Sequence, residues 1–233
     1  MRLETLKELN TERAARRPVI VVTDVANGEQ RLVKAKDFAV DPIGAELSKQ
    51  LRMGKSGTVE VAGKKLFLNV YAPTAKLVII GAVHISQALV PIAHALDYDV
   101  TVVDPRTAFA SPERFPDVPL IAEWPDVALP PLNIDHYTAF VALTHDPKID
   151  DPALLHAFQR DCFYIGALGS RKTHGKRAER LRALGAKESD IARIHAPIGL
   201  VIGAVSPSEI AVAIMAEITA ELRLPPKEKD AAA

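Results

Sequence analysis

Four short runs of glycine, hydroxyl and charged residues each follow directly on an apolar segment that is typical of a β-strand. The candidates in these runs are Gly81, His84, Asp104, Arg106, Thr144, His145, Asp146, Gly166, Gly169, Ser170 and Arg171. In open α/β sheets, ligands bind in the crevice beyond the carboxyl ends of the strands. Backbone N–H groups, arginine and histidine could hold an anionic ligand there. The sequence therefore predicts one binding crevice built from several loops.

Gly81 begins a turn that departs from the dinucleotide-binding fingerprint. G-x-G-x-x-G would place glycines at positions 81, 83 and 86, but the chain has Val83 and Ser86. A valine at the second position would hinder the close approach of a pyrophosphate. The helix expected to begin near His84 still offers free N–H groups at its N-terminus. The alternative is that Gly81 only makes the turn and His84 only caps the helix.

Asp104 follows the second strand of the same unit, 23 residues after Gly81. An acid in this position commonly accepts the ribose hydroxyls of a nucleotide. Arg106 could pair with a phosphate. The alternative is that Asp104 begins the turn before Pro105. We expect a binding role, because strand position and spacing agree.

Residues 166–172 are the strongest candidate for an anion site. Gly166 and Gly169 allow tight backbone geometry, and Ser170 can cap the helix that follows. Arg171 and Lys172 add positive charge beside the exposed N–H groups. The alternative is a plain turn before a solvated basic helix.

His145 and Asp146 could act as an acid–base pair, joined by His195 if the fold brings it near. They do not make a metal site, because a metal needs three or four ligands in a spacing that is missing here. The alternative is that Asp146 begins a turn and His145 packs. The single cysteine, Cys162, precedes an apolar strand and is expected to be inert. We therefore expect neither a catalytic residue nor a metal site.

The composition narrows the class of protein. Lys+Arg and Asp+Glu each number 29, so no net field attracts nucleic acid or an anionic membrane. One cysteine in 233 residues excludes an internal disulfide framework and fits a reducing compartment. There is no apolar run long enough to span a membrane and no signal-like N-terminus. These features predict a cytoplasmic protein without nucleic-acid or membrane partners.

The pattern of apolar residues predicts two domains and a tail. Residues 1–73 suggest a small α+β module with two hairpins, and residues 225–233 suggest a disordered tail. Residues 74–224 alternate strands and helices, which predicts a Rossmann-like parallel sheet with helices on both faces. Strands are expected at 77–80, 100–103, 138–144 and 163–165, helices at 84–96, 151–160, 171–184, 188–193 and 207–223, and a loop at 195–199.

Residues 78–218 resemble the XdhC/CoxI family of xanthine dehydrogenase accessory proteins. The resemblance rests on GAVHI (81–85), VVDPR (102–106), FP (115–116), LTHD (143–146), YIGALGSR (164–171), IHAPIGL (194–200), IGA (202–204) and PSEI (207–210). These motifs occur together and in order over about 140 residues. Two features depart from the family. Its first turn usually is G-A-G-H, where this chain has Val83, and residues 1–72 lack the glycine–cysteine motif of many members.

The resemblance implies a chaperone for the molybdenum cofactor (molybdopterin) rather than an enzyme. Such a protein shields the cofactor, presents it to a cysteine desulfurase-like sulfur donor and passes it to the xanthine dehydrogenase apoenzyme. The cofactor phosphate is then expected at residues 166–172 and the pterin near Asp104, Arg106 and His145. The basic helix after Arg171, or the His195 loop, is expected to face the partner enzyme. An NAD(P)-dependent oxidoreductase, a protein-only adaptor, a bound nucleotide and a homodimer stay open as alternatives.

Overall fold

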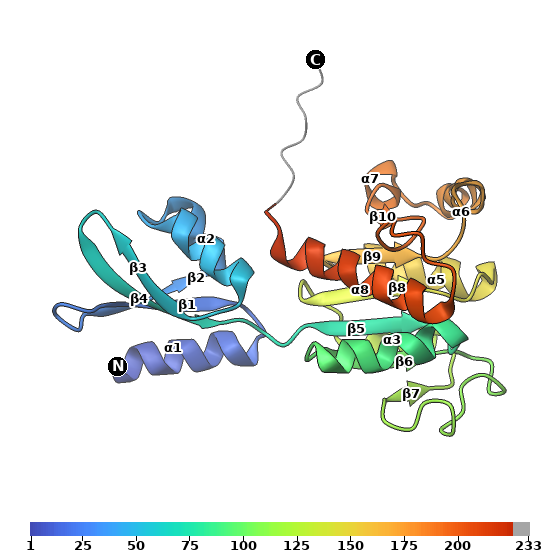
Figure 1. Ribbon diagram of the computed structural model, residues 1–233, viewed down its shortest axis with the longest axis horizontal. Coiled ribbons are helices and arrows are strands. Elements are labelled where there is room, and N and C mark those ends of the chain that lie inside the picture. The colour runs from blue at the N-terminus through green and yellow to red at the C-terminus, as the bar shows by residue number, and fades with distance from the viewer. Residues whose placement is uncertain (226–233) are drawn as a thin grey trace, which may run out of the picture. The chain divides into compact units, whose positions relative to one another are not determined.

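The computed structural model describes residues 1–225 (Figure 1). The chain forms two compact units, one of Met1–Pro73 and one of Thr74–Leu222. The predicted tail, 225–233, lies outside the described residues except for Pro225. Each unit has its own sheet and its own core, and each is described by itself.

The first unit is a four-stranded antiparallel sheet in the order β2-β1-β4-β3. Its elements are α1 (Leu3–Ala14), β1 (Val19–Asp24), β2 (Gln30–Lys34), η1 (Ala35–Val40), α2 (Gly44–Met53), β3 (Gly57–Val61) and β4 (Lys64–Tyr71). Side chains alternate across β1, so Val19 and Val21 face α1 while Ile20 and Val22 face α2. Helices therefore cover both faces of this small sheet.

The second unit is a six-stranded parallel sheet in the order β10-β9-β8-β5-β6-β7. Its strands are β5 (Lys76–Ile80), β6 (Asp99–Val103), β7 (Leu120–Ile121), β8 (Thr138–Ala142), β9 (Tyr164–Ala167) and β10 (Ile194–His195). Its helices are α3 (His84–Ala95), α4 (Pro125–Ala128), η2 (Pro130–Leu132), α5 (Pro147–Phe158), α6 (Arg171–Ala183), α7 (Glu188–Ile191) and α8 (Pro207–Arg223). Counted along the chain, the strand order is 3-2-1-4-5-6, the order of the Rossmann fold. The predicted fold class is confirmed.

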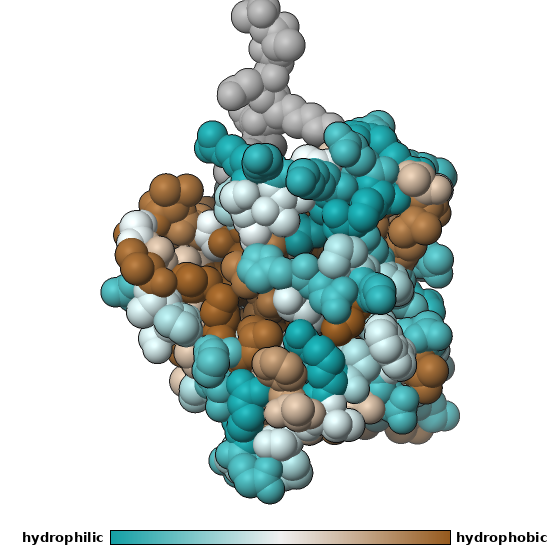
Figure 2. All heavy atoms as spheres, turned by 90° about the vertical axis from the view of Figure 1, so that its right-hand side faces the viewer, coloured by the Kyte–Doolittle hydropathy of each residue, from teal (hydrophilic) through white to brown (hydrophobic). Residues whose placement is uncertain are grey.

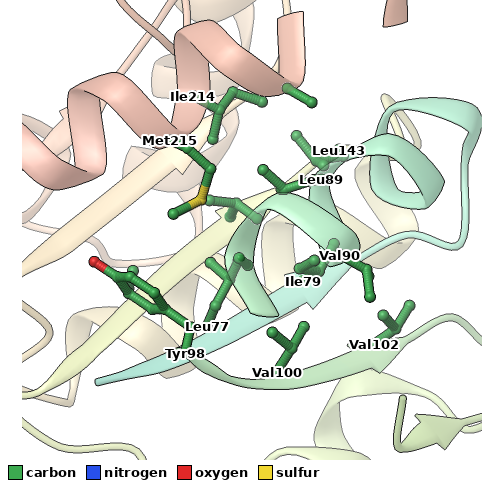
Figure 3. Packing of buried hydrophobic residues seen from close by; sticks show 14 of the residues in the cluster. Leu77, Ile79, Leu89, Val90, Tyr98, Val100, Val102, Leu143, Ile214 and Met215 are labelled. Atoms are coloured by element: carbon green, nitrogen blue, oxygen red, sulfur yellow. The ribbon is translucent and has the colours of Figure 1, made fainter. Parts of the chain in front are cut away.

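Helices cover this sheet on both faces (Figure 1), as is usual for parallel sheets whose central strands, here β5 and β8, are almost entirely apolar. On one face, Leu77 and Ile79 pack with Leu89 of α3 and with Ile214 and Met215 of α8 (Figure 3). On the other face, Val78, Ile80 and Phe140 pack with α5 and α6. Two buried layers therefore hold the strands, and with them the loops at the strand ends.

The strand order places a switch point between β5 and β8. From β5 the chain turns to β6 on one side, and later returns to β8 on the other. All six strands are parallel, so their carboxyl ends lie along one rim of the sheet. The helices α3, α5 and α6 begin at this rim. Ligands of such sheets bind in the crevice beside the switch point.

Three segments of this unit differ from the expectations. The helix expected at 151–160 begins at Pro147, because Asp146 caps it and Pro147 suits its first turn, which leaves Pro152 inside it. The loop expected at 195–199 starts with β10, which pairs with β9 at an edge of the sheet. Residues 111–131, a segment rich in proline in which no helix or strand is expected, contain β7 and α4. Two-residue strands leave no periodicity that a sequence pattern could reveal.

Candidate functional site

The first turn joins β5 to α3 through a close backbone approach. Gly81 has a φ of +111°, and a Cβ atom there would lie 2.7 Å from Cγ2 of Thr144. The buried Ser86 donates a hydrogen bond to the carbonyl of Gly81. Val83 precedes α3 with a φ of −98°, a conformation that does not need glycine. The missing glycines therefore do not distort the turn, and the exposed His84 begins the helix.

Arg114, which sequence reasoning missed, fixes this turn from the outside. Its guanidinium donates to the carbonyl oxygens of Ala82 and Phe109, both at 2.8 Å, and to the side chain of Gln87 at 2.8 Å. The segment after β6 is thereby folded back onto the start of α3. Arg114 lies within the proline-rich segment, where no local pattern distinguishes it from a solvated arginine.

Asp104 is fully buried and its carboxylate is occupied by the protein. It accepts hydrogen bonds from the Ala82 N–H at 2.8 Å and from the Arg106 N–H at 2.9 Å, and the Arg106 guanidinium binds both oxygens. Burial raises the pKa of Asp104, but these hydrogen bonds outweigh it and hold the pKa below its usual value. A ligand at the rim would therefore meet the half-exposed Arg106 rather than Asp104.

The loop after β8 is held by a buried carboxylate that the sequence did not reveal. Asp150 accepts hydrogen bonds from Thr144 Oγ1 at 2.7 Å and from the His145 N–H at 3.1 Å. His145 is exposed, with a φ of +63°. Asp146 caps α5 by accepting from the Lys148 N–H at 2.9 Å. Thr144 is thus a buried support, while His145 faces solvent at the rim instead of packing.

The two glycines in the turn after β9 have different roles. A Cβ at Gly166 would lie 2.5 Å from Ile198 and 2.7 Å from the hydroxyl of Tyr164. The glycine therefore leaves room for these two side chains to pack against the strand. Gly169 has a φ of +132° and makes the turn. Ser170 caps α6 by accepting from the Thr173 N–H at 3.2 Å. The exposed Arg171 and Lys172 follow, and their backbone N–H groups have no acceptor within the helix.

Beneath this turn lies a charged group with few partners. Arg177 of α6 is 2 % exposed; its Nη2 donates to the Leu168 carbonyl at 2.7 Å and lies 4.0 Å from Asp150. Its Nε and Nη1, and Nδ1 of His174, are buried without a hydrogen-bond partner among the described residues. Burial lowers the pKa of Arg177 and raises that of Asp150. Buried polar groups in native proteins are nearly always paired, so this cluster needs an explanation.

His195 lies at the edge of the sheet in a separate hydrogen-bonded group. Its Nδ1 is 3.2 Å from Glu217 of α8, which also accepts from the Tyr164 hydroxyl and the Gly199 N–H. Burial raises the pKa of Tyr164. The His195 and Tyr164 rings are 4.6 Å apart. Glu217 thus orients the imidazole and anchors the loop after β10, a role that its position in a helical pattern did not reveal.

The structure brings the predicted residues to one rim in two groups. The strands β6 and β8 flank β5, so the loops that follow them lie on either side of the β5–α3 turn. The negative charges of Asp104, mainly, and of Asp146 raise the pKa of Arg106. The β9–α6 turn comes next, and His195 follows beyond it at the sheet edge.

Within residues 1–225 there is no cluster of three His, Cys, Asp or Glu residues suited to a metal. Burial raises the pKa of the Cys162 thiol to about 12, which makes it a poor nucleophile. Among the helices of the described residues, none is long and apolar enough to cross a membrane.

Comparisons with known proteins agree with this architecture. The model of the XdhC Rossmann domain matches residues 77–218. A solved structure described as a xanthine dehydrogenase from Bacillus halodurans superposes with a TM-score of 0.65. It is 23% identical and aligns with 99% of this chain and 66% of its own. At that identity the likeness shows the fold alone.

Curated relatives share about 30% of the aligned residues. The uncharacterized protein YqeB of Escherichia coli is 32% identical over 72% of this chain and 32% of its own length. The molybdenum cofactor insertion chaperone PaoD of Escherichia coli is 31% identical over 68% and 43%. A probable subunit of xanthine dehydrogenase from Bacillus subtilis is 30% identical over 66% and 44%. The chain thus spans less than half the length of these relatives. The family match over more than half of its residues shows that the chain belongs to the XdhC family.

Proposed function

We propose that this protein binds the molybdenum cofactor, shields it and delivers it to the xanthine dehydrogenase apoenzyme. The family supports the proposal, as does the similarity to a relative named as a molybdenum cofactor insertion chaperone. The observation that carries it is the β9–α6 turn, where free helix N–H groups, Arg171 and buried unpaired donors lie together. Such a combination suits the phosphate of the cofactor.

The phosphate occupies the β9–α6 turn in this proposal. The backbone N–H groups of Arg171 and Lys172 point out of the helix start, where the helix dipole favours negative charge. Ser170 already satisfies the Thr173 N–H, so those two donors are left for the ligand. The guanidinium of Arg171 closes over the phosphate from the solvent side.

The pterin lies over the loops after β6 and β8. Arg106 and Asp146 offer donors and an acceptor to its hydrogen-bonding edge, and His145 is exposed beside them. Asp104 contributes indirectly, because its buried carboxylate holds Arg106 and the Ala82 N–H in place. No side chain in this arrangement acts as a nucleophile, as suits a carrier whose cargo leaves unchanged or with one added sulfur. A cysteine desulfurase-like protein is the sulfur donor in this proposal.

Two other functions compete with the chaperone. An NAD(P)-dependent oxidoreductase needs the pyrophosphate to approach the first turn, and the side chain of Val83 lies where the second glycine would be. A protein-only adaptor is favoured by the exposed apolar residues after β10 described below. Acid oxidation of protein purified from cells that make molybdenum cofactor separates the three functions. A fluorescent pterin supports the chaperone, and a bound nucleotide, measured in parallel, supports the oxidoreductase. If the protein carries neither a pterin nor a nucleotide, the adaptor is supported.

Arg171→Ala should lower the pterin retained by the purified protein about tenfold, because a charge-assisted hydrogen bond to the phosphate is lost. Pterin fluorescence per mole of protein is the measurement. The matched control is Arg182→Ala on the same helix, since Arg182 pairs with Glu188 instead of facing the turn. Equal retention in the wild type and both variants would contradict the proposed phosphate seat.

The loop after β10 offers a surface for the partner enzyme. Leu200, Val201, Ile202 and Val205 are all exposed, and Val201 is as exposed as in an extended chain. Figure 2 shows the side toward which β5 points in Figure 1. Hydrophobic residues (brown) gather on the left of this face. Large exposed apolar patches commonly mark protein interaction sites. The partner is the dehydrogenase apoenzyme in this proposal.

Replacing both Val201 and Val205 by aspartate should weaken binding to the apoenzyme at least about tenfold, because apolar contact area becomes charged. Surface plasmon resonance with immobilised apoenzyme measures the affinity. Pterin retention should stay at the wild-type level. Val127→Asp, which alters an exposed valine of α4, is the control and should bind normally. Normal binding by the double variant would exclude this loop from the interface.

A further inference from the structure

The buried guanidinium of Arg177 has one strong hydrogen bond for five donor hydrogens. Its Nη2 donates to the Leu168 carbonyl at 2.7 Å, and the nearest carboxylate oxygen, of Asp150, is 4.0 Å away. Both oxygens of Asp150 already accept hydrogen bonds from Thr144 and His145. Nε and Nη1 are enclosed without an acceptor among the described residues. A buried arginine normally satisfies its donors with carboxylate or phosphate oxygens.

Arg177 lies against the turn that precedes α6. Leu168, which accepts its one short hydrogen bond, is followed directly by Gly169 and the capping Ser170. His174 lies three residues before Arg177, on the same side of the helix and closer to its start. Its Nδ1 is also buried and unpaired. Both groups therefore lie on one side of α6 near its start, and each lacks a partner that an anion at the turn would supply.

We propose that Arg177 and His174 are the inner donors of the anion site at the β9–α6 turn, and that the ligand they take is a phosphate group. The inference rests on the proposed function for the identity of the whole cargo, but only the phosphate is needed here. The outer donors are the N–H groups of Arg171 and Lys172. The ligand displaces residues 168–170 outward, and its oxygens then accept from Nε or Nη1 of Arg177.

The turn is suited to such a displacement. Gly169, with a φ of +132°, is the residue at which the backbone can most readily change direction. Leu168 and Gly169 are half-buried and Ser170 is exposed, so a small outward movement uncovers the donors below. Across the crevice, the exposed His145 also has a positive φ, so neither wall of the crevice is regular structure. A phosphate that enters supplies the acceptor that Nε and Nη1 of Arg177 lack.

Inorganic phosphate is the probe, titrated into the full chain and followed by calorimetry. Arg177→Gln should raise the Kd at least about tenfold, because a charged donor in a water-poor site is lost. His174→Gln should raise it severalfold while leaving Arg177 in place. Arg182→Gln, an exposed arginine on the same helix, should bind as the wild type does. The Nε–H resonance of Arg177, assigned by its absence in Arg177→Gln, should shift on adding phosphate.

The outcomes separate this inference from the proposed function. Unchanged phosphate affinity in both Arg177→Gln and His174→Gln, with pterin still retained, overturns the inner site and leaves the chaperone standing. Phosphate binding that depends on Arg177, without any retained pterin, supports the inner site and removes the proposed cargo. No binding of phosphate to the wild-type chain overturns the inference. If Arg177→Gln does not fold because Asp150 loses its counter-charge, the phosphate affinity of His174→Gln decides the question.

Discussion

Asp104→Ala should lower the free energy of unfolding by about 3 kcal/mol, the scale expected when one partner of a buried ion pair is removed. The change strips four hydrogen bonds from the Ala82 N–H and from Arg106. It leaves the cation of Arg106 against a cavity that holds no counter-charge. Urea unfolding followed by circular dichroism measures the loss. We expect the retention of cofactor to fall as well, because Arg106 is no longer fixed.

The same carboxylate should shape the acid stability of the protein. The pKa of Asp104 is lower in the folded state than in the unfolded chain, so the folded state binds fewer protons. Its contribution to stability is then present above about pH 4 and is lost as the pH falls through the folded-state pKa. Asp104→Asn should therefore show a flatter decline of unfolding free energy between about pH 5 and pH 3.

A control distinguishes this buried pair from ordinary surface charges. Glu188 pairs with Arg182 at the surface, with side chains that are 71% and 48% exposed. Glu188→Ala should leave the unfolding free energy almost unchanged, since exposed pairs are solvated in both states. If Asp104→Ala and Glu188→Ala had the same free energy of unfolding, Asp104 would not stabilise the β5–α3 turn.

The fold class of the second unit could be predicted from the sequence because its central strands are buried on both faces. Runs such as 77–80 and 138–142 contain only apolar residues and threonine, which few structures other than a covered parallel strand accommodate. The cap of α6 was predicted, and the cap of α5 was not. Ser170 accepts the hydrogen bond expected of a residue that precedes a helix. Asp146 caps α5, which begins four residues before the predicted start. Local sequence patterns therefore predicted most of the helix and strand boundaries of this unit.

The supporting residues of the site were not predictable, because each acts at long range. Asp150 and Arg177 lie within helices, where a charged residue is usually solvated, yet the folded chain buries both. Glu217 reaches His195 over 22 residues, and Arg114 reaches Ala82 over 32. Asp104 was recognised as special from its spacing, but only the structure reveals that Arg106 occupies its carboxylate. Which residues face a ligand and which support those residues depends on tertiary contacts.

Gly81→Ala should destabilise the second domain by roughly 2 to 6 kcal/mol. A φ of +111° strains any residue with a Cβ, at a cost of about 1 to 3 kcal/mol. The added methyl group would also lie 2.7 Å from Cγ2 of Thr144, and such overpacking costs about 1 to 3 kcal/mol more. Gly175→Ala is the control, since its Cβ meets nothing within 4 Å in the middle of α6. That variant should gain about 0.5 to 1 kcal/mol.

A double-mutant cycle separates the two costs of Gly81→Ala. Thr144→Ser removes the Cγ2 atom that the new methyl would strike, but retains the Oγ1 that donates to Asp150. In the Thr144→Ser background, Gly81→Ala should lose its steric cost and keep its backbone strain, so the coupling free energy should be about 1 to 3 kcal/mol. A coupling near zero would mean that β5 and β8 are farther apart at the switch point than the structure has them. With the expected coupling, the floor of the crevice is closed between these two residues, and any ligand must lie above them on the loops.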